Sequence, residues 1–339
     1  MKSLLLFTLL LLASTRTFGQ DYWQQQVDYT ITVKLDDVKH LLSGHERFVY
    51  HNQSPQTLDF IYIHLWPNAY TSWKTDLGKQ LYEDGDDLLR FGNDSVRGGI
   101  DSLHFQVNGQ DAVLQINPKK PDIAKLILNQ ALRPGESITV TTPFRVKIPS
   151  GEISRLGHVG KSYQITQWYP KPALYDKNGW NQIPYLTQGE FYSEYGTFDV
   201  SITLPKNYVV GATGDLQTES ERAFMDFLHG KSFKERGLPN DFLGDKSFPK
   251  SAAEWKTIRF TQKDVHDFAW FADKRFLVLK GEVELPRSKR KVTTWSLFTP
   301  QNAELWKRAP EYIHDGTYYY SLWNGDYPYN QVTAVDGTI

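Results

Sequence analysis

The 339-residue sequence contains no cysteine, only two methionines, and no long apolar run apart from the one at its start. Without cysteine there is no disulfide, no thiol nucleophile and no lipid anchor of the cysteine-linked type. A chain of this length can bury roughly three quarters of its unfolded surface, so it can be stable without cross-links. After residue 19, no stretch reaches the ~20 apolar residues of a membrane-spanning helix.

The first residues have the pattern of a secretory signal peptide. Lys2 precedes an apolar run from Leu4 to Ala13, and a polar stretch then leads to Gly19. The run is short for a membrane span, so an N-terminal anchor is the weaker interpretation. We therefore expect residues 1–19 to be removed on export, which predicts a periplasmic or extracellular protein.

Charge of neither sign is in excess, because 38 Lys and Arg stand against 39 Asp and Glu. This balance favours neither a nucleic acid nor an anionic membrane surface as a partner. Aromatic residues are abundant, at 14% of the chain with ten Trp. In all-β proteins such residues mostly fill the core, and a surface that stacks on sugars is the minor alternative.

Alternation of apolar and polar residues predicts a mainly β fold. Residues 27–35 alternate with period two, similar patterns recur along the chain, and Asn108-Gly109 predicts a type I′ hairpin. Evenly spaced strands with few helices indicate an antiparallel β-sandwich or saddle-shaped sheet over residues 20–275. Within it, residues 217–256 are charged and interrupt the strand pattern, so we predict a surface insertion with a short helix.

The last part of the chain, residues 276–339, has a different pattern. Two strand patterns, near 276–285 and 291–298, are followed by a helix predicted from about Pro300 to Tyr320. The buried face of this helix is expected to carry Trp306, Ala309, Ile313 and Tyr320. No polar tail precedes Ile339, so we expect the fold of this region to be unfinished.

No catalytic motif is complete in the sequence. Zinc peptidases carry His-Glu-x-x-His on a helix, because residues four apart place both imidazoles on one face beside the glutamate. The one His-Glu pair, His45-Glu46, is followed by a histidine at 51 in a predicted strand, so the spacing fails. Signatures of serine hydrolases and of phosphate-binding loops are missing too. We therefore predict no catalytic residue and no metal ligand.

Five segments carry a family resemblance when they are taken in order. They are Ile165-Thr166-Gln167-Trp168-Tyr169-Pro170, Ile183-Pro184-Tyr185, Phe198 to Pro205, Val265 to Trp270, and Trp306 with Tyr318 to Tyr329. Together they resemble the N-terminal part of the aminopeptidase N-like zinc metallopeptidases (peptidase family M1), in the secreted bacterial branch. The resemblance covers about Tyr22 to Ile339, with one departure: Leu186 to Glu190 replaces the family's usual Cys and Asp-Glu-Pro.

The resemblance implies an N-terminal β-saddle, residues 20–275, that covers a thermolysin-like α/β catalytic domain. Residues 276–339, strands plus a helix, would be the incomplete start of that second domain. It implies that Gln167 contacts the first residue and the free amino group of a peptide substrate. An equal alternative is that Gln167 only forms a hydrogen bond to backbone within its loop. Trp168 and Tyr169 are expected to be packing residues. The family's Gly-x-Met-Glu-Asn segment and its zinc ligands would follow Ile339, so zinc is expected in the full-length family and not on this chain.

The main hypothesis is the N-terminal portion of a secreted zinc-dependent aminopeptidase, a hydrolase that removes N-terminal residues from peptides. By this hypothesis the chain alone is inactive. The alternative is a non-catalytic all-β module that binds or scaffolds peptide, glycan or protein, and a catalytically inactive relative is a third possibility. Limited proteolysis separates the first two, since trimming back to about residue 275 would indicate an unfinished domain.

Overall fold

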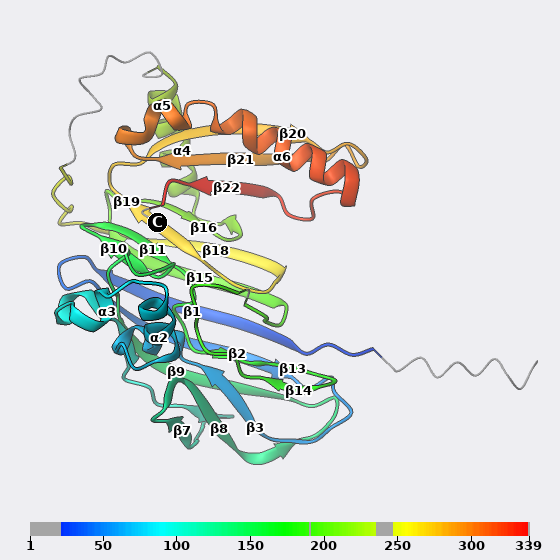
Figure 1. Cartoon of the computed structure of the whole chain (residues 1–339). Coiled ribbons are helices and arrows are strands. Elements are labelled where there is room, and N and C mark those ends of the chain that lie inside the picture. Colours follow the sequence, from blue (N-terminus) through cyan, green and yellow to red (C-terminus); the bar gives the residue numbers. More distant parts are fainter. Residues whose placement is uncertain (1–21, 190, 235–246, 338–339) are drawn as a thin grey trace, which may run out of the picture.

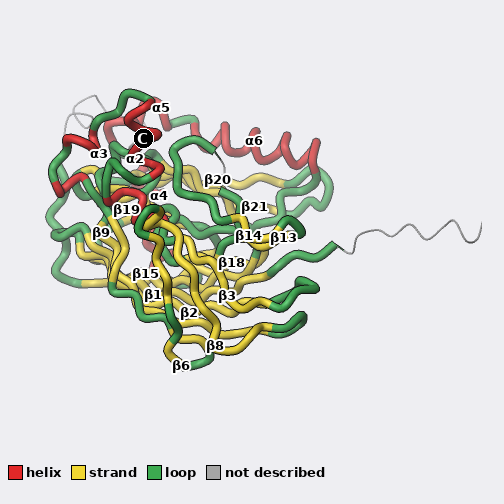
Figure 2. The backbone as a smooth tube through the Cα atoms, turned by 60° about the horizontal axis from the view of Figure 1, so that its bottom comes forward, coloured by secondary structure: helices red, strands yellow, loops and turns green. Residues whose placement is uncertain are grey.

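The computed structural model describes residues 22–189, 191–234 and 247–337, so the predicted signal peptide lies outside the described residues. Strands dominate the described chain and form five sheets, which confirms the predicted mainly β fold (Figure 1). Figure 2 shows the strands as the body of the molecule, with the red helices α2, α3 and α6 at its margins. In the three described ranges, no helix is both long and apolar enough to cross a membrane.

The largest sheet has nine strands. In spatial order they are β17 (Asp215–Leu216), β18 (Trp255–Val265), β15 (Gly196–Pro205), β1 (Gln26–Asp36), β2 (Leu41–His51), β9 (Ser137–Lys147), β5 (Gln106–Val107) and β6 (Gln110–Asp111), with β4 (Gly99–Asp101) paired to β9. Every second residue of β1 is buried from Val27 to Leu35, as the alternation predicts. β1 pairs parallel with β15, with Ile31 opposite Val200, so the sheet is mixed rather than wholly antiparallel.

Smaller sheets and helices cover this sheet. One four-stranded sheet has the order β12 (Lys171–Pro172), β3 (Leu58–His64), β8 (Lys120–Leu132) and β7 (Leu114–Asn117). Another has the order β10 (Gly157–Val159), β11 (Ser162–Ile165), β19 (Trp270–Asp273) and β16 (Val209–Ala212). A hairpin is formed by β13 (Leu174–Asp176) and β14 (Gly179–Asn181). The segment after β3 contains short helices, η1 (Trp66–Thr71), α2 (Asp76–Glu83), α3 (Leu88–Phe91) and η2 (Asp94–Val96). Between the layers lies an aromatic core that includes fully buried Trp66, Trp168 and Trp270.

The turn between β5 and β6 has the predicted geometry. Val107 pairs with Gln110, so the loop consists of Asn108 and Gly109 alone. Their φ angles are 50° and 79°, the left-handed values that a type I′ turn requires at both positions. Asn and Gly adopt this conformation at little cost, and the hairpin is therefore confirmed.

A separate three-stranded sheet follows β19. It consists of β20 (Leu277–Glu284), β21 (Lys291–Phe298) and β22 (Gln331–Val335), and β22 lies parallel to β21. Between β21 and β22 come η5 (Pro300–Asn302), α5 (Ala303–Trp306) and α6 (Ala309–Asn324), and Figure 1 shows α6 across β20 and β21. The change of sheet lies near residue 275, although the domain boundary itself stays a prediction.

The predicted helix from Pro300 to Tyr320 is wrong in two details. It is divided, because α5 ends at Trp306 and α6 begins at Ala309. The inward face of α6 follows steps of four residues, so Ser321 is buried whereas Tyr320 is 68% exposed. Steps of four from buried Ala309 lead to Ser321 and not to Tyr320. The side chain of Tyr320 therefore points toward solvent.

The charged region after β17 contributes more to the packing than a surface insertion would. Its helix, α4 (Glu219–Lys234), buries Met225 against Val209, Val278 and Leu297, which come from two different sheets. Buried Glu221 also binds Lys256 of β18, with 2.7 Å between Oε1 and Nζ. The helix therefore joins the last sheet to the rest of the chain.

A glycine lies where the last sheet meets β16. A β-carbon at Gly211 would lie 2.6 Å from Cδ1 of Leu297 and 3.1 Å from methyl groups of Thr333 and Val335. These distances are shorter than a carbon–carbon contact allows. The absence of a side chain at Gly211 thus permits β16 to approach β21 and β22 closely.

Candidate functional site

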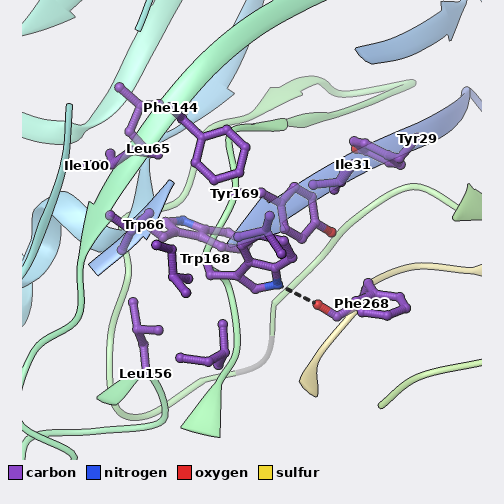
Figure 3. Packing of buried hydrophobic residues seen from close by; sticks show 14 of the residues in the cluster. Tyr29, Ile31, Leu65, Trp66, Ile100, Phe144, Leu156, Trp168, Tyr169 and Phe268 are labelled. Carbon is purple, nitrogen blue, oxygen red and sulfur yellow. Dashed lines mark hydrogen bonds between the residues drawn. The ribbon is translucent and has the colours of Figure 1, made fainter. Parts of the chain in front are cut away.

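The candidate site is built around the loop between β11 and β12, which contains Gln167. On either side of this glutamine the chain is anchored in the core, because Ile165 and Trp168 are fully buried. The indole Nε1 of Trp168 donates to the backbone oxygen of Phe268 at 3.0 Å, as the dashed line in Figure 3 shows. Trp168 and Tyr169 are thus confirmed as packing residues.

Gln167 itself is held in an unusual conformation. Its φ is 47°, a left-handed value that few residues other than Gly, Asn and Asp adopt. Its Nε2 donates to Oδ2 of Asp267 at 3.3 Å, and its Oε1 is buried without a hydrogen-bond partner among the described residues. A buried orphan acceptor is costly, so its presence here is compatible with an amide oxygen reserved for a donor. The contact with a substrate stays a prediction.

Asp267 is the group on which this loop converges. Besides Gln167, it accepts from the hydroxyl of Tyr169 at 2.6 Å and from the backbone of Phe268 at 2.8 Å, and it lies 3.3 Å from Nζ of Lys171. Burial opposes ionisation, but the Lys171 charge and these hydrogen bonds outweigh it and lower the pKa of Asp267. The result is an ion pair between buried Lys171 and partly buried Asp267, which fixes the loop.

Two further polar residues lie buried near Lys171. Glu46 of β2 is fully buried, and burial raises the pKa of its carboxyl well above the usual range, although Lys171 opposes this. His64 of β3 is also buried, and burial followed by the Lys171 charge lowers its pKa to about 3. Neither side chain has a hydrogen-bond partner in the part of the chain that the structure describes. His64 is therefore neutral at pH 7, and burial favours the protonated, uncharged form of Glu46.

These residues do not form a zinc site. His45 and Glu46 are neighbours on β2, where successive side chains point to opposite faces, so His45 is exposed while Glu46 is inside. Across residues 22–189, 191–234 and 247–337, no three His, Asp or Glu side chains are grouped to hold a metal ion. The donor sets of zinc sites contain three or four such ligands, so the described residues do not fit zinc.

A second glutamine, three residues before Gln167, lies beside the end of β22. Gln164 is buried in β11, and its Nε2 donates to the backbone oxygen of Ser154 at 3.1 Å. A β-carbon at Gly337 would lie 3.7 Å from Oε1 of Gln164. The strand end is fixed by Asp336, which accepts from Oγ1 of Thr299 at 2.7 Å. The sequence gives no signal for Gln164, because it lies within an ordinary strand pattern.

Two hollows lie where β16 meets the last sheet. One, of about 400 Å³, is lined by α4, β17 and β21, with Trp295 and Lys280 among its residues. The other, of about 250 Å³, is lined by Tyr327 and Tyr329 together with β19 and β22. Both hollows are lined in part by β16 and β22, and only the larger one has the volume of a small-ligand site.

The sequence matches no family model and no curated protein, but the structure has counterparts among solved proteins. A crystal structure of a two-domain M1 zinc metallopeptidase variant, bound to L-tryptophan, superposes with a TM-score of 0.50 at 13% identity; 93% of this chain and 57% of that chain are covered. The fold resembles that of M1 zinc metallopeptidases. A Deinococcus radiodurans M1 enzyme variant with a bound Tyr-Ser-Ala substrate has the same TM-score and identity, over 92% and 56% of the two chains.

The coverage of these matches is uneven. Nearly all of the chain is matched, whereas it spans just over half the length of the solved M1 structures. At 13–14% identity the likeness concerns the fold and carries no residue-level assignment. What those enzymes bind is a property of those enzymes, and its relevance to this chain is a proposal.

Proposed function

We propose that this chain is the N-terminal portion of an exported zinc-dependent aminopeptidase, in which it forms one wall of the peptide-binding cleft. The proposal rests on one observation above all: a fold shared over nine-tenths of the chain with M1 zinc metallopeptidases. Zinc would be held by residues other than those that the structure describes, whose side chains do not fit a zinc site.

In this proposal the chain binds and orients the substrate. Gln167 would accept a hydrogen bond from the N-terminal ammonium of a peptide through Oε1, which has no other partner among the described residues. Asp267 would hold the opposite end of the amide through Nε2. Because Oε1 is enclosed, the side chain must turn or the loop must open for this contact, and the positive φ at Gln167 is where such a change would begin.

The first test is the nucleotide sequence after codon 339, which by this proposal continues in frame and encodes Gly-x-Met-Glu and His-Glu-x-x-His. The protein encoded by that longer frame should release N-terminal residues in a zinc-dependent reaction. Gln167→Ala should raise KM more than it lowers kcat, because it removes a contact made in the bound ground state. Gln188→Ala, at an exposed position in another loop, serves as the control. Absence of the zinc motif would contradict the assignment to a zinc aminopeptidase. Unchanged kinetics of Gln167→Ala would contradict the proposed contact between Gln167 and the substrate.

A further inference from the structure

A pocket near the start of the described chain lies outside the Gln167 site. It has a volume of about 380 Å³, within the range of small-ligand sites. Three segments form it: residues 22–24, the hairpin strand β13 with its turn, and residues 192–195. Its aromatic lining residues are Tyr22, Trp23, Tyr175, Tyr192 and Tyr195.

Some of these aromatic side chains are exposed to solvent, and some lie close to one another. Tyr192 and Tyr195 are 52% and 47% exposed, and the ring of Trp23 lies 5.7 Å from that of Tyr175. Aromatic faces carry negative charge density, and a group of them attracts cations. The chemistry of these walls therefore favours a ligand with both an apolar body and a positive charge.

Glu194 contributes a buried carboxylate to the same pocket. The residue is only 5% exposed, and its Oε2 has no hydrogen-bond partner in the described chain. Burial raises its pKa to about 7, although the side chain of Gln24 and the backbone of Gln25 oppose the shift by hydrogen bonding. A buried carboxylate oxygen without a donor is costly, and an ammonium group in the pocket would supply that donor once the enclosed carboxylate turns toward it.

The other polar groups near Glu194 do not place a positive charge beside its carboxylate inside the pocket. Asp176 of β13 is negative and itself raises the pKa of Glu194. Tyr50, which lies behind Glu194 in the core, has a buried hydroxyl without a partner among the described residues. Lys177 is the one cation among the lining residues, and it is exposed at the turn. The two carboxylates thus outnumber the single lysine at this site.

We propose that this pocket binds an organic ammonium ion, with the charged nitrogen on Glu194 and the apolar body against the tyrosine and tryptophan rings. The site is independent of the proposed peptidase function, because it uses neither Gln167 nor a metal. An amine attached to an aromatic or alkyl group is the ligand class that matches both the rings and the carboxylate.

The experiment measures binding of phenethylammonium to the purified chain by titration calorimetry, with the change in total tryptophan fluorescence, which includes Trp23, as a second signal. The matched control ligand is 2-phenylethanol, which has the same shape and no charge. We expect the ammonium to bind at least roughly tenfold more tightly than the alcohol. Affinity should also fall as the pH drops below the Glu194 pKa of about 7, because protonation removes the negative charge.

Two variants test the residues. Glu194→Gln should weaken ammonium binding at least roughly tenfold and abolish its pH dependence. Tyr192→Ala should weaken it without disturbing the fold, because the side chain is half exposed; Tyr312→Ala, at 58% exposure on α6, is the matched control and should change nothing. Equal binding of ammonium and alcohol, no binding of the ammonium, or unchanged affinity in both Glu194→Gln and Tyr192→Ala would overturn the proposal.

Discussion

Replacing Glu46 by glutamine should stabilise the protein by an amount that increases with pH. In the folded protein the carboxyl of Glu46 is buried, and burial raises its pKa well above its ordinary value of 4.5. The folded state therefore keeps a proton that the unfolded chain releases above about pH 4.5. Glu46 contributes most to stability below that pH, and its contribution is lost as the pH rises toward the folded pKa.

The magnitude follows from proton linkage. One proton held only by the folded state costs about 1.4 kcal/mol of unfolding free energy per pH unit. Above about pH 4.5 the wild-type protein should therefore lose stability relative to Glu46→Gln, by at most about 1.4 kcal/mol for each pH unit. Glutamine has the shape of the protonated glutamate and cannot ionise, so it removes this pH dependence while the packing is kept.

The assay is urea unfolding at half-unit pH intervals, with the difference in free energy between variant and wild type plotted against pH. Glu83→Gln at an exposed position on α2 is the matched control and should give a flat plot. Using differences cancels titrations shared by both proteins, such as that of His64. A flat plot for Glu46→Gln as well, within about 0.5 kcal/mol, would refute the assignment of Glu46 as a neutral buried acid.

Other substitutions test the ion pair and the junction. Asp267→Asn should cost about 3–5 kcal/mol in urea unfolding, because it leaves the buried charge of Lys171 without its carboxylate, and adding Lys171→Met should recover most of the loss. A double variant no more stable than Asp267→Asn would contradict a charged pair. Gly211→Ala should lower stability by about 1–3 kcal/mol, because the new methyl group would lie 2.6 Å from Leu297. Gly230→Ala in α4, where a β-carbon meets nothing within 4 Å, should instead stabilise by up to about 1 kcal/mol, and equal midpoints for these two glycine variants would contradict the crowding at the junction.

Much of the fold could be predicted from local patterns. Alternation gave the bounds of β1 and β21 closely, and Asn108-Gly109 gave both the position and the type of a hairpin. The pairing of strands could not be predicted in this way. Period-two alternation indicates which side chains are buried but not which strand lies alongside, so the parallel contact between β1 and β15, far apart in the chain, carries no local signal.

The site was less accessible to sequence reasoning than the fold. Gln167 was found through a family resemblance, and its bond to Asp267 joins residues 100 positions apart. Glu46, His64 and Lys171 come from three strands and follow no motif, so only the folded chain reveals that they share a buried region. The His45-Glu46 pair shows the converse, because adjacency in a strand separates the two side chains.

The most direct test of the central claim is an aminopeptidase assay of the purified chain with added zinc. We propose that this chain supplies the substrate side of an M1-type enzyme, and its described residues do not fit a metal site. This proposal predicts no turnover of an aminoacyl amide substrate above the uncatalysed rate, with or without zinc. Zinc-dependent hydrolysis that a chelator abolishes, in material free of other peptidases, would contradict it.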